Sequence, residues 1–78
     1  MKDIEQGLKD VAQRIVNAEN NFADTVQEVT SCTRKEAFKV LALYRKFKMV
    51  KLDAVCGRYT VNHGSFWEEH VLRNAIEY

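Results

Sequence analysis

Two cysteines and two histidines are the side chains best suited to metal binding or catalysis, because thiolate and imidazole groups bind zinc and serve as nucleophile and base. A zinc site normally draws its ligands in closely spaced pairs. Here 23, 6 and 6 residues separate the successive members, Cys32, Cys56, His63 and His70. A Cys–His catalytic pair also lacks an evident third group, and the chain has no glycine-rich phosphate loop. We therefore expect no metal, no cofactor and no enzymatic activity, with Cys32 a small buried residue.

Positive charge is concentrated in the middle of the chain. Residues 31–58 carry eight lysines and arginines against two carboxylates, a net charge of +6, whereas residues 1–30 carry −3 and residues 59–78 carry −2. A solvent-facing helix normally mixes charge signs, because opposite charges four residues apart stabilise it by about 0.2–0.5 kcal/mol per pair. Between Arg34 and Lys51 the only acid is Glu36. The pattern favours an anionic partner, nucleic acid first, with a merely solvated face as the alternative.

Length and composition favour one globular domain, residues 1–78. The chain is 46% hydrophobic and 29% charged, a normal balance for a folded protein. No apolar run approaches the roughly 20 residues that span a bilayer, and the charged, amphipathic start does not match a secretory signal. Two widely spaced cysteines do not form a secreted disulfide framework. These features predict a reduced, cytoplasmic protein that does not contact membranes.

Apolar residues at helical spacing predict two helices in the first thirty residues. The first covers about 4–19, and Asp3 with Gln6 supplies its N-terminal cap. The second is short, is capped by Asn21 and covers 22–30.

A third helix carries most of the positive charge. Thr33 and Glu36 have the spacing of a capping box, which predicts a helix that begins at Arg34 and runs to about Phe47. Its expected inner face consists of Ala37, Val40, Leu41 and Tyr44.

After the basic helix, apolar residues recur at every second position, which predicts a β-hairpin. Strands are expected over 50–54 and 58–62, because apolar and polar residues alternate there. Gly57 supplies the positive φ that a tight turn needs. A final helix is expected over 66–77, with Ser65 and Glu68 as a second capping box.

The predicted fold is mainly α with a small β-hairpin, in the order α-α-α-β-β-α. In the stretch "FADTVQEVTSCTRKEAFKVLALYRKFKMVKLD" followed by "GRYTV", this order resembles the winged helix-turn-helix superfamily, and it is similar in build to small regulators of phages and bacteria. The resemblance implies a basic helix that enters the DNA major groove and a hairpin that acts as the wing. The sequence "TSCT" replaces the small residue and glycine usual in the turn of that superfamily.

The resemblance also implies particular DNA contacts. Base edges would be met at the start of the basic helix by Thr33, Arg34, Lys35, Phe38 and Lys39. Phosphates would be met by Arg45, Lys46, Lys48 and Lys51, and the adjacent groove or backbone by Arg58 in the wing. The expected function is that of a small double-stranded-DNA-binding protein that regulates transcription or recombination.

Two alternatives remain open from the sequence. Phe38 on the outer face can contact a thymine methyl, but it can equally pack in the core or against another protein. The chain would then be a winged-helix interaction module, an adaptor or inhibitor of another protein without DNA binding, and its low net charge of +1 supports that reading. A homodimer is also open, through the apolar stripe of the first helix or through Phe66, Trp67 and Tyr78, although a thin core needs the same side chains.

Overall fold

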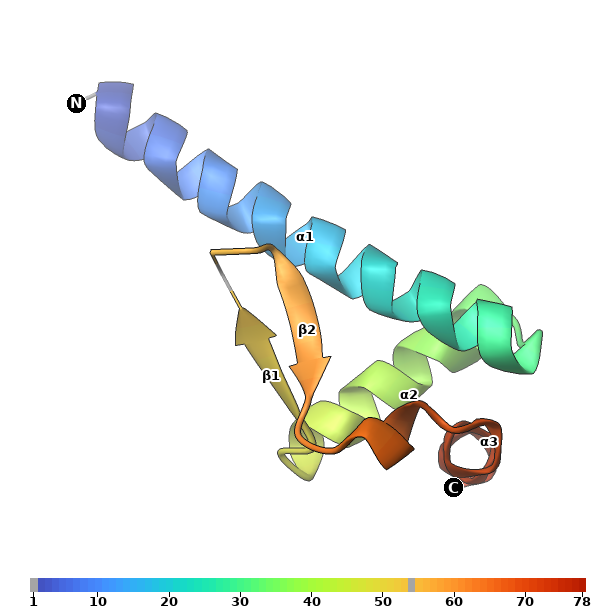
Figure 1. Cartoon of the computed structure of the whole chain (residues 1–78). Helices are drawn as coiled ribbons and strands as arrows, with labels where there is room; N and C mark the ends of the chain where they lie inside the picture. The colour runs from blue at the N-terminus through green and yellow to red at the C-terminus, as the bar shows by residue number, and fades with distance from the viewer. Residues whose placement is uncertain (1, 54) are drawn as a thin grey trace.

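The computed structural model describes residues 2–53 and 55–78, with side chains from residue 9 onward. The elements are α1 (Lys2–Thr30), α2 (Arg34–Lys46), β1 (Val50–Asp53), β2 (Arg58–Val61), the 3-10 turn η1 (Gly64–Trp67) and α3 (Glu69–Glu77). Figure 1 shows α1 running across the molecule, with the hairpin beneath its middle and α2 and α3 near its C-terminal half. The molecule is elongated, 48 × 23 × 18 Å, because the start of α1 projects beyond the other elements.

The two helices predicted within residues 4–30 are one continuous helix, so the predicted order α-α-α-β-β-α is wrong at its start. The reason is that buried residues follow one another at intervals of four straight through the asparagine pair, which keeps one helical face continuous. These residues are Ala18, Phe22, Val26 and Thr30. Asn21 does not begin a new helix; its carbonyl accepts a hydrogen bond from the Thr25 hydroxyl within α1, at 3.0 Å. The expected cap by Asp3 and Gln6 lies outside the described side chains.

A tight turn joins α1 to α2, as a helix-turn-helix requires. Ser31 takes a left-handed conformation, with φ of 57°, and its N–H donates to the Gln27 carbonyl at 2.8 Å. This is the helix-ending geometry in which glycine is usual. The predicted capping box is confirmed, because the Thr33 side chain accepts from the Glu36 N–H while the Glu36 carboxylate accepts from the Thr33 N–H. Cys32, expected to be buried, is half-buried in this turn.

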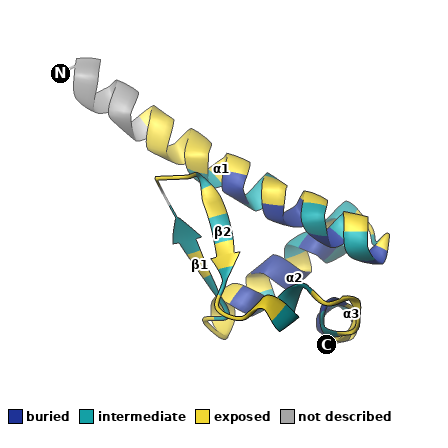
Figure 2. Ribbon diagram, in the orientation of Figure 1, coloured by how far each residue is buried: buried dark blue, intermediate teal, exposed yellow. Residues whose placement is uncertain are grey.

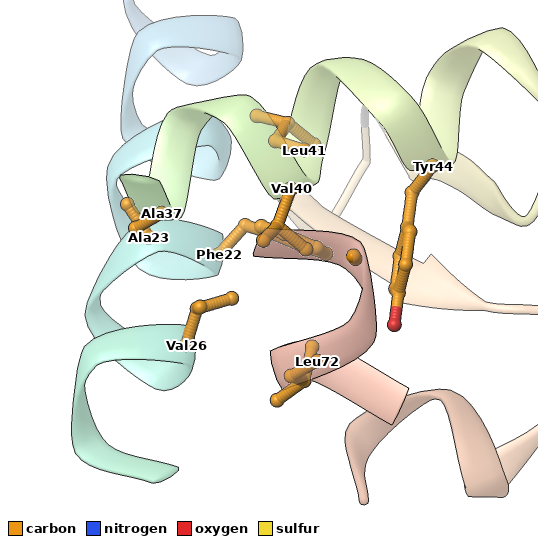
Figure 3. Packing of buried hydrophobic residues seen from close by; sticks show 9 residues of the cluster. Phe22, Ala23, Val26, Ala37, Val40, Leu41, Tyr44 and Leu72 are labelled. Carbon is orange, nitrogen blue, oxygen red and sulfur yellow. The ribbon is translucent and has the colours of Figure 1, made fainter. Parts of the chain in front are cut away.

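The core lies where α1, α2 and α3 meet, and Figure 2 shows burial restricted to their facing sides. The inner face predicted for α2 is confirmed, since Ala37, Val40, Leu41 and Tyr44 are the buried residues of that helix. Figure 3 shows Val40 and Tyr44 extending from α2 toward Phe22 of α1 and Leu72 of α3, which belong to the same buried cluster. Phe22 also contacts aromatic rings from two other segments, Tyr59 at 6.2 Å and Trp67 at 4.9 Å between ring centroids. One aromatic side chain therefore joins the helices to the hairpin and to η1.

The hairpin is confirmed in place and in turn chemistry. Val50 pairs with Val61 and Asp53 with Arg58 in an antiparallel ladder, and Gly57 has the expected positive φ, 66°. Ala54, which was assigned to the first strand, lies outside the described residues. The hairpin tip lies against α1, because a Cβ built on Gly57 would come within 3.8 Å of the Arg14 Cβ. The segment that the resemblance makes a wing is thus packed beneath α1 (Figure 1).

The final helix begins later than predicted. Residues Gly64–Trp67 form η1, and α3 starts at Glu69, after Glu68 in an extended conformation. The predicted Ser65–Glu68 capping box is wrong, because the Ser65 hydroxyl is hydrogen-bonded to His63 Nδ1 at 2.7 Å. His63 is the residue that caps this turn, since its Nδ1 also accepts from the Ser65 N–H. None of the helices in the described part of the chain is long and apolar enough to cross a membrane.

Candidate nucleic-acid interface

The outer side of α2 presents a straight row of lysines. Its members follow at intervals of four, three and four residues, which places them on one face of a helix. We call this row, consisting of Lys35, Lys39, Ala42 and Lys46, the lysine stripe; all four residues are exposed. It lies opposite the buried face of α2, so the packing that builds the core also orients the lysines outward. Ala42, in the middle of the stripe, has only a methyl side chain, so a ligand can approach the helix closely there.

No carboxylate in the described part of the chain forms an ion pair with the lysine stripe. The ion pairs found there join Arg34 to Asp24 and Arg73 to Glu69, and His70 Nδ1 lies 3.6 Å from the Glu68 carboxylate. Glu36, the only acid in the basic stretch, is held in the capping box. Hydrogen bonds from the Thr33 N–H and then from its hydroxyl keep the pKa of the Glu36 carboxyl below its usual value. The charge of Lys39 also lowers the pKa of the Glu36 carboxyl, but the lysine stripe forms no ion pair within the described part of the chain.

Lys39 has one internal contact. Its Nζ donates to the Ile76 carbonyl at 2.8 Å, at the C-terminal end of α3. An ammonium group is stabilised there because the carbonyls at a helix end carry partial negative charge. This contact brings the end of α3 next to the lysine stripe.

Three further cations are exposed: Arg45 in the last turn of α2, and Lys48 and Lys51 in the segment that follows the helix. Lys48 follows the helix end in a left-handed conformation, with φ of 56°. Its N–H donates to the Arg45 carbonyl at 3.1 Å, while the Met49 N–H donates to the Tyr44 carbonyl at 2.8 Å. This double hydrogen bond is the Schellman motif, which fixes the turn from α2 into β1. Thr33, at the other end of α2, is exposed and serves as the N-cap.

Arg34 and Phe38, assigned above to base contacts, lie against the body of the protein. The Arg34 guanidinium pairs with Asp24 and donates to Gln27 Oε1 and Asn20 Oδ1, each at 2.9 Å. The same guanidinium covers the Phe38 ring, 5.2 Å from its centroid, and Phe38 is half-buried against the core. These contacts fasten α2 to α1, so we leave both residues out of the proposed contact surface. The sequence held a signal for this, because positions 20, 24 and 27 place three acceptors on one face of α1.

Arg58 is exposed but stands apart from the basic surface of α2. It borders a hollow of about 430 Å³ together with residues of α1, among them the carboxylates Asp24 and Glu28. Six of the predicted cations are thus exposed on α2 or the segment after it, namely Lys35, Lys39, Arg45, Lys46, Lys48 and Lys51, whereas Arg34 and Arg58 lie beside α1.

Two exposed aromatics form a pair that the sequence did not predict, although Tyr78 was considered above for a dimer contact. Phe47, at the end of α2, and Tyr78, at the end of α3, are 51% and 77% exposed, and their ring centroids lie 6.1 Å apart at 79°. Lys46 Nζ lies 5.9 Å from the Phe47 ring centroid. The two aromatics are thirty-one positions apart in the sequence, and only the packing of α3 on α2 brings them together.

The thiols and imidazoles do not assemble into a site in the described residues. No three His, Cys, Asp or Glu side chains of that part gather closely enough to hold a metal ion. Cys56 is exposed in the hairpin turn, and a hydrogen bond to Asp53 and its charge raise the pKa of the thiol above its ordinary value. A raised pKa lowers the fraction of reactive thiolate at neutral pH.

Comparison with known protein families, with curated proteins and with solved structures finds no match for this chain. The order of the elements is two helices, a two-stranded antiparallel hairpin and a further helix.

Proposed function

We propose that this protein binds double-stranded DNA through the lysine stripe of α2, as a small regulator of winged helix-turn-helix type. The observation that carries the proposal is the exposure of six cations on α2 and the segment after it, with no described carboxylate paired to them. Phosphate neutralisation by Lys and Arg supplies most of the affinity of such proteins for DNA. A partner that carries regularly spaced negative charge explains this arrangement better than solvent does.

In the proposed complex the N-terminal part of α2 enters the major groove. Lys35 reaches toward base edges there, Lys39 lies beside it with its ammonium on the Ile76 carbonyl, and Thr33 stands at the helix entry. Arg45, Lys46, Lys48 and Lys51 contact phosphates on either side. The hairpin supports α1 and Phe22, and it takes part in DNA binding through Lys51 rather than through its tip.

Lys35→Glu tests this proposal without harming the fold. Position 35 lies in the first turn of α2, where a carboxylate is stabilised by the helix dipole by about 0.3–1 kcal/mol. We expect the melting temperature to stay level or rise while the affinity for a 30-base-pair duplex falls at least tenfold. Lys9→Glu is the matched control, because Lys9 is an exposed lysine on α1 that lies outside the basic surface. Equal loss in both variants, or no loss in either, would contradict the proposal.

A second candidate function is protein binding, and a specific observation favours it at another place than Phe38. An apolar hollow of about 220 Å³ lies between α1 and the hairpin tip, lined by Val11, Arg14, Ile15, Leu52 and Val55. Val55 is 88% exposed at its rim. The partner we propose is a second copy of this chain, because the same patch contains both a hollow and a protruding valine, as a two-fold interface requires. A dimer would present two lysine stripes to one duplex.

Light scattering of Val55→Asp measures this association. Under the proposal the wild type has the mass of a dimer and Val55→Asp that of a monomer. Val16→Asp is the control, since Val16 is 48% exposed on α1 and does not line the hollow. A monomeric wild type would refute self-association and leave DNA binding untouched.

A further inference from the structure

We propose that the exposed pair Phe47 and Tyr78 is a stacking platform for the bases of an unpaired nucleic-acid strand. The proposal adds a second binding mode beside the duplex contact, and it shares the lysine stripe with the proposed function.

The first support is the exposure of the two rings and their contact with each other. An apolar aromatic such as Phe47 is normally removed from water, yet half of its surface is open. Its position is fixed by the end of α2, since its N–H donates to the Leu43 carbonyl at 3.1 Å. Tyr78 is held by its own N–H, which donates to the Ala75 carbonyl at 3.3 Å. The two rings contact each other edge to face, with centroids 6.1 Å apart at 79°.

The second support is the charge around the pair. Lys46 precedes Phe47 directly and places its ammonium over that ring, and Lys39 holds the end of α3 two residues before Tyr78. The lysine stripe rises about 16 Å along α2 from Lys35 to Lys46 and ends at the platform. A strand whose phosphates follow this stripe therefore reaches the rings with its bases. Positively charged tracks that end in aromatic side chains are the usual means of holding single strands.

The relative strength of two contacts decides whether a base can occupy the Phe47 face. The Lys46 ammonium now lies over that face, and an exposed cation–π contact of this kind changes an equilibrium about two- to fivefold. Stacking of one base on an aromatic side chain contributes about 5- to 150-fold. A base therefore displaces the ammonium, which is then free to meet the phosphate that accompanies the base.

The same charges argue against a second copy of this chain as the occupant. Two copies joined through this face would bring Lys39 and Lys46 toward their counterparts, and like charges at an interface disfavour association. A base-paired duplex offers its bases only at their edges. An unpaired strand offers both a base face and a phosphate, which matches rings and lysines together.

Fluorescence anisotropy with labelled (dT)12 and with the 30-base-pair duplex tests the platform. Tyr78→Ala and Phe47→Ala should each weaken (dT)12 binding at least fivefold while changing duplex affinity less than twofold. Phe47→Trp should preserve or strengthen (dT)12 binding, because a larger ring stacks better. Val16→Ala, a substitution at a similarly exposed apolar residue on α1, should change neither. Because Tyr78 is 77% exposed, its loss cannot unfold the protein and the test remains valid even where Phe47→Ala melts early.

Each further result bears on one of the two proposals. Binding of (dT)12 that is insensitive to both ring substitutions, or an equal loss for duplex and single strand, overturns the platform. Ring-dependent binding of (dT)12 without any duplex binding supports the platform and refutes the proposed function. A matching experiment with (U)12 tells whether the unpaired strand is DNA or RNA. A change of molecular mass on Tyr78→Ala, seen by light scattering, would assign the rings to protein association and overturn the proposal.

Discussion

Lys48 offers a substitution for which stability and binding should change in opposite directions. Its backbone is left-handed, at φ of 56°, and a residue with a Cβ loses about 1–2 kcal/mol in that conformation. Glycine relieves this strain, but it also stabilises the unfolded chain by about 0.4–1 kcal/mol, because it has more conformational freedom there. Lys48→Gly should therefore raise the free energy of unfolding by about 0.5–1 kcal/mol. For a domain of this size that corresponds to an increase of about 3–6 °C in melting temperature.

The same substitution removes one cation from the proposed DNA surface. Each neutralised phosphate contributes about 0.9 to the slope of log affinity against log salt. Lys48→Gly should make that slope less negative by about 0.9 and lower the affinity at 0.1 M salt on the order of tenfold. A more stable protein that binds more weakly cannot be explained by partial unfolding.

Ser31→Gly is the matched control for the backbone effect. Ser31 is also exposed and left-handed, at φ of 57°, but it carries no charge. It should gain a similar increase in melting temperature and leave the affinity for DNA unchanged. The assays are thermal melts followed by circular dichroism, and anisotropy titrations at several salt concentrations. A lower melting temperature for Lys48→Gly would refute the reasoning on the helix end, and an unchanged salt slope would remove Lys48 from the DNA surface.

Three further substitutions test hydrogen bonds and ion pairs within the protein. Arg34→Ala should cost about 1 kcal/mol of stability, because partly exposed charge-assisted bonds to α1 are lost, while the salt slope of DNA binding stays the same; a changed slope would return Arg34 to the interface. Tyr44→Phe removes a hydroxyl that donates to the Phe66 carbonyl at 2.8 Å and should cost about 0.5–1.5 kcal/mol at neutral pH. Burial raises the pKa of Tyr44, so the stability that its neutral hydroxyl contributes is present below the unfolded-state pKa near 10 and is lost as the pH rises through the folded-state pKa. Urea titrations between pH 8 and 12 should therefore show a smaller alkaline loss of stability in Tyr44→Phe than in the wild type. An unchanged loss would contradict this. Hydrogen bonds from the N–H groups of Cys56 and Val55 lower the pKa of Asp53, so the stability that its carboxylate contributes is present above the unfolded-state pKa near 4 and is lost as the pH falls through the folded-state pKa. Asp53→Asn should be less stable than the wild type at neutral pH and should lose less stability between pH 5 and 2. An acid transition identical to that of the wild type would exclude Asp53 as its source.

The features of the fold that local rules decide could be predicted from the sequence. Thr33 and Glu36 determine the start of α2, and the 3.6-residue period determines its buried face, because both depend on residues within a few turns. The hairpin followed from the change to a period of two and from Gly57. The break predicted at Asn20 and Asn21 is wrong, because a continuous buried face stabilises one helix more than two turn-forming side chains disfavour it.

The remaining features depend on contacts between distant segments. Arg34 looked like one more cation of a basic helix, but three acceptors on α1 bind it. Arg58 was assigned to a projecting wing, but the hairpin tip lies against α1. Ser31 and Lys48 occupy left-handed positions where no glycine marks the turn, and tertiary packing determines both. Helical spacing did indicate that the lysines of α2 would point to solvent, and their role in DNA binding stays a prediction.

The central claim, that the cations of α2 and the following segment bind duplex DNA, is tested most directly by the salt dependence of the wild-type protein. Four cations, Arg45, Lys46, Lys48 and Lys51, are assigned to phosphates, and they give a slope of log affinity against log salt of about −3.6. Affinity for a 30-base-pair duplex should then fall about 10²-fold between 50 and 200 mM salt. A slope near zero, or no binding at 50 mM salt, would contradict the claim.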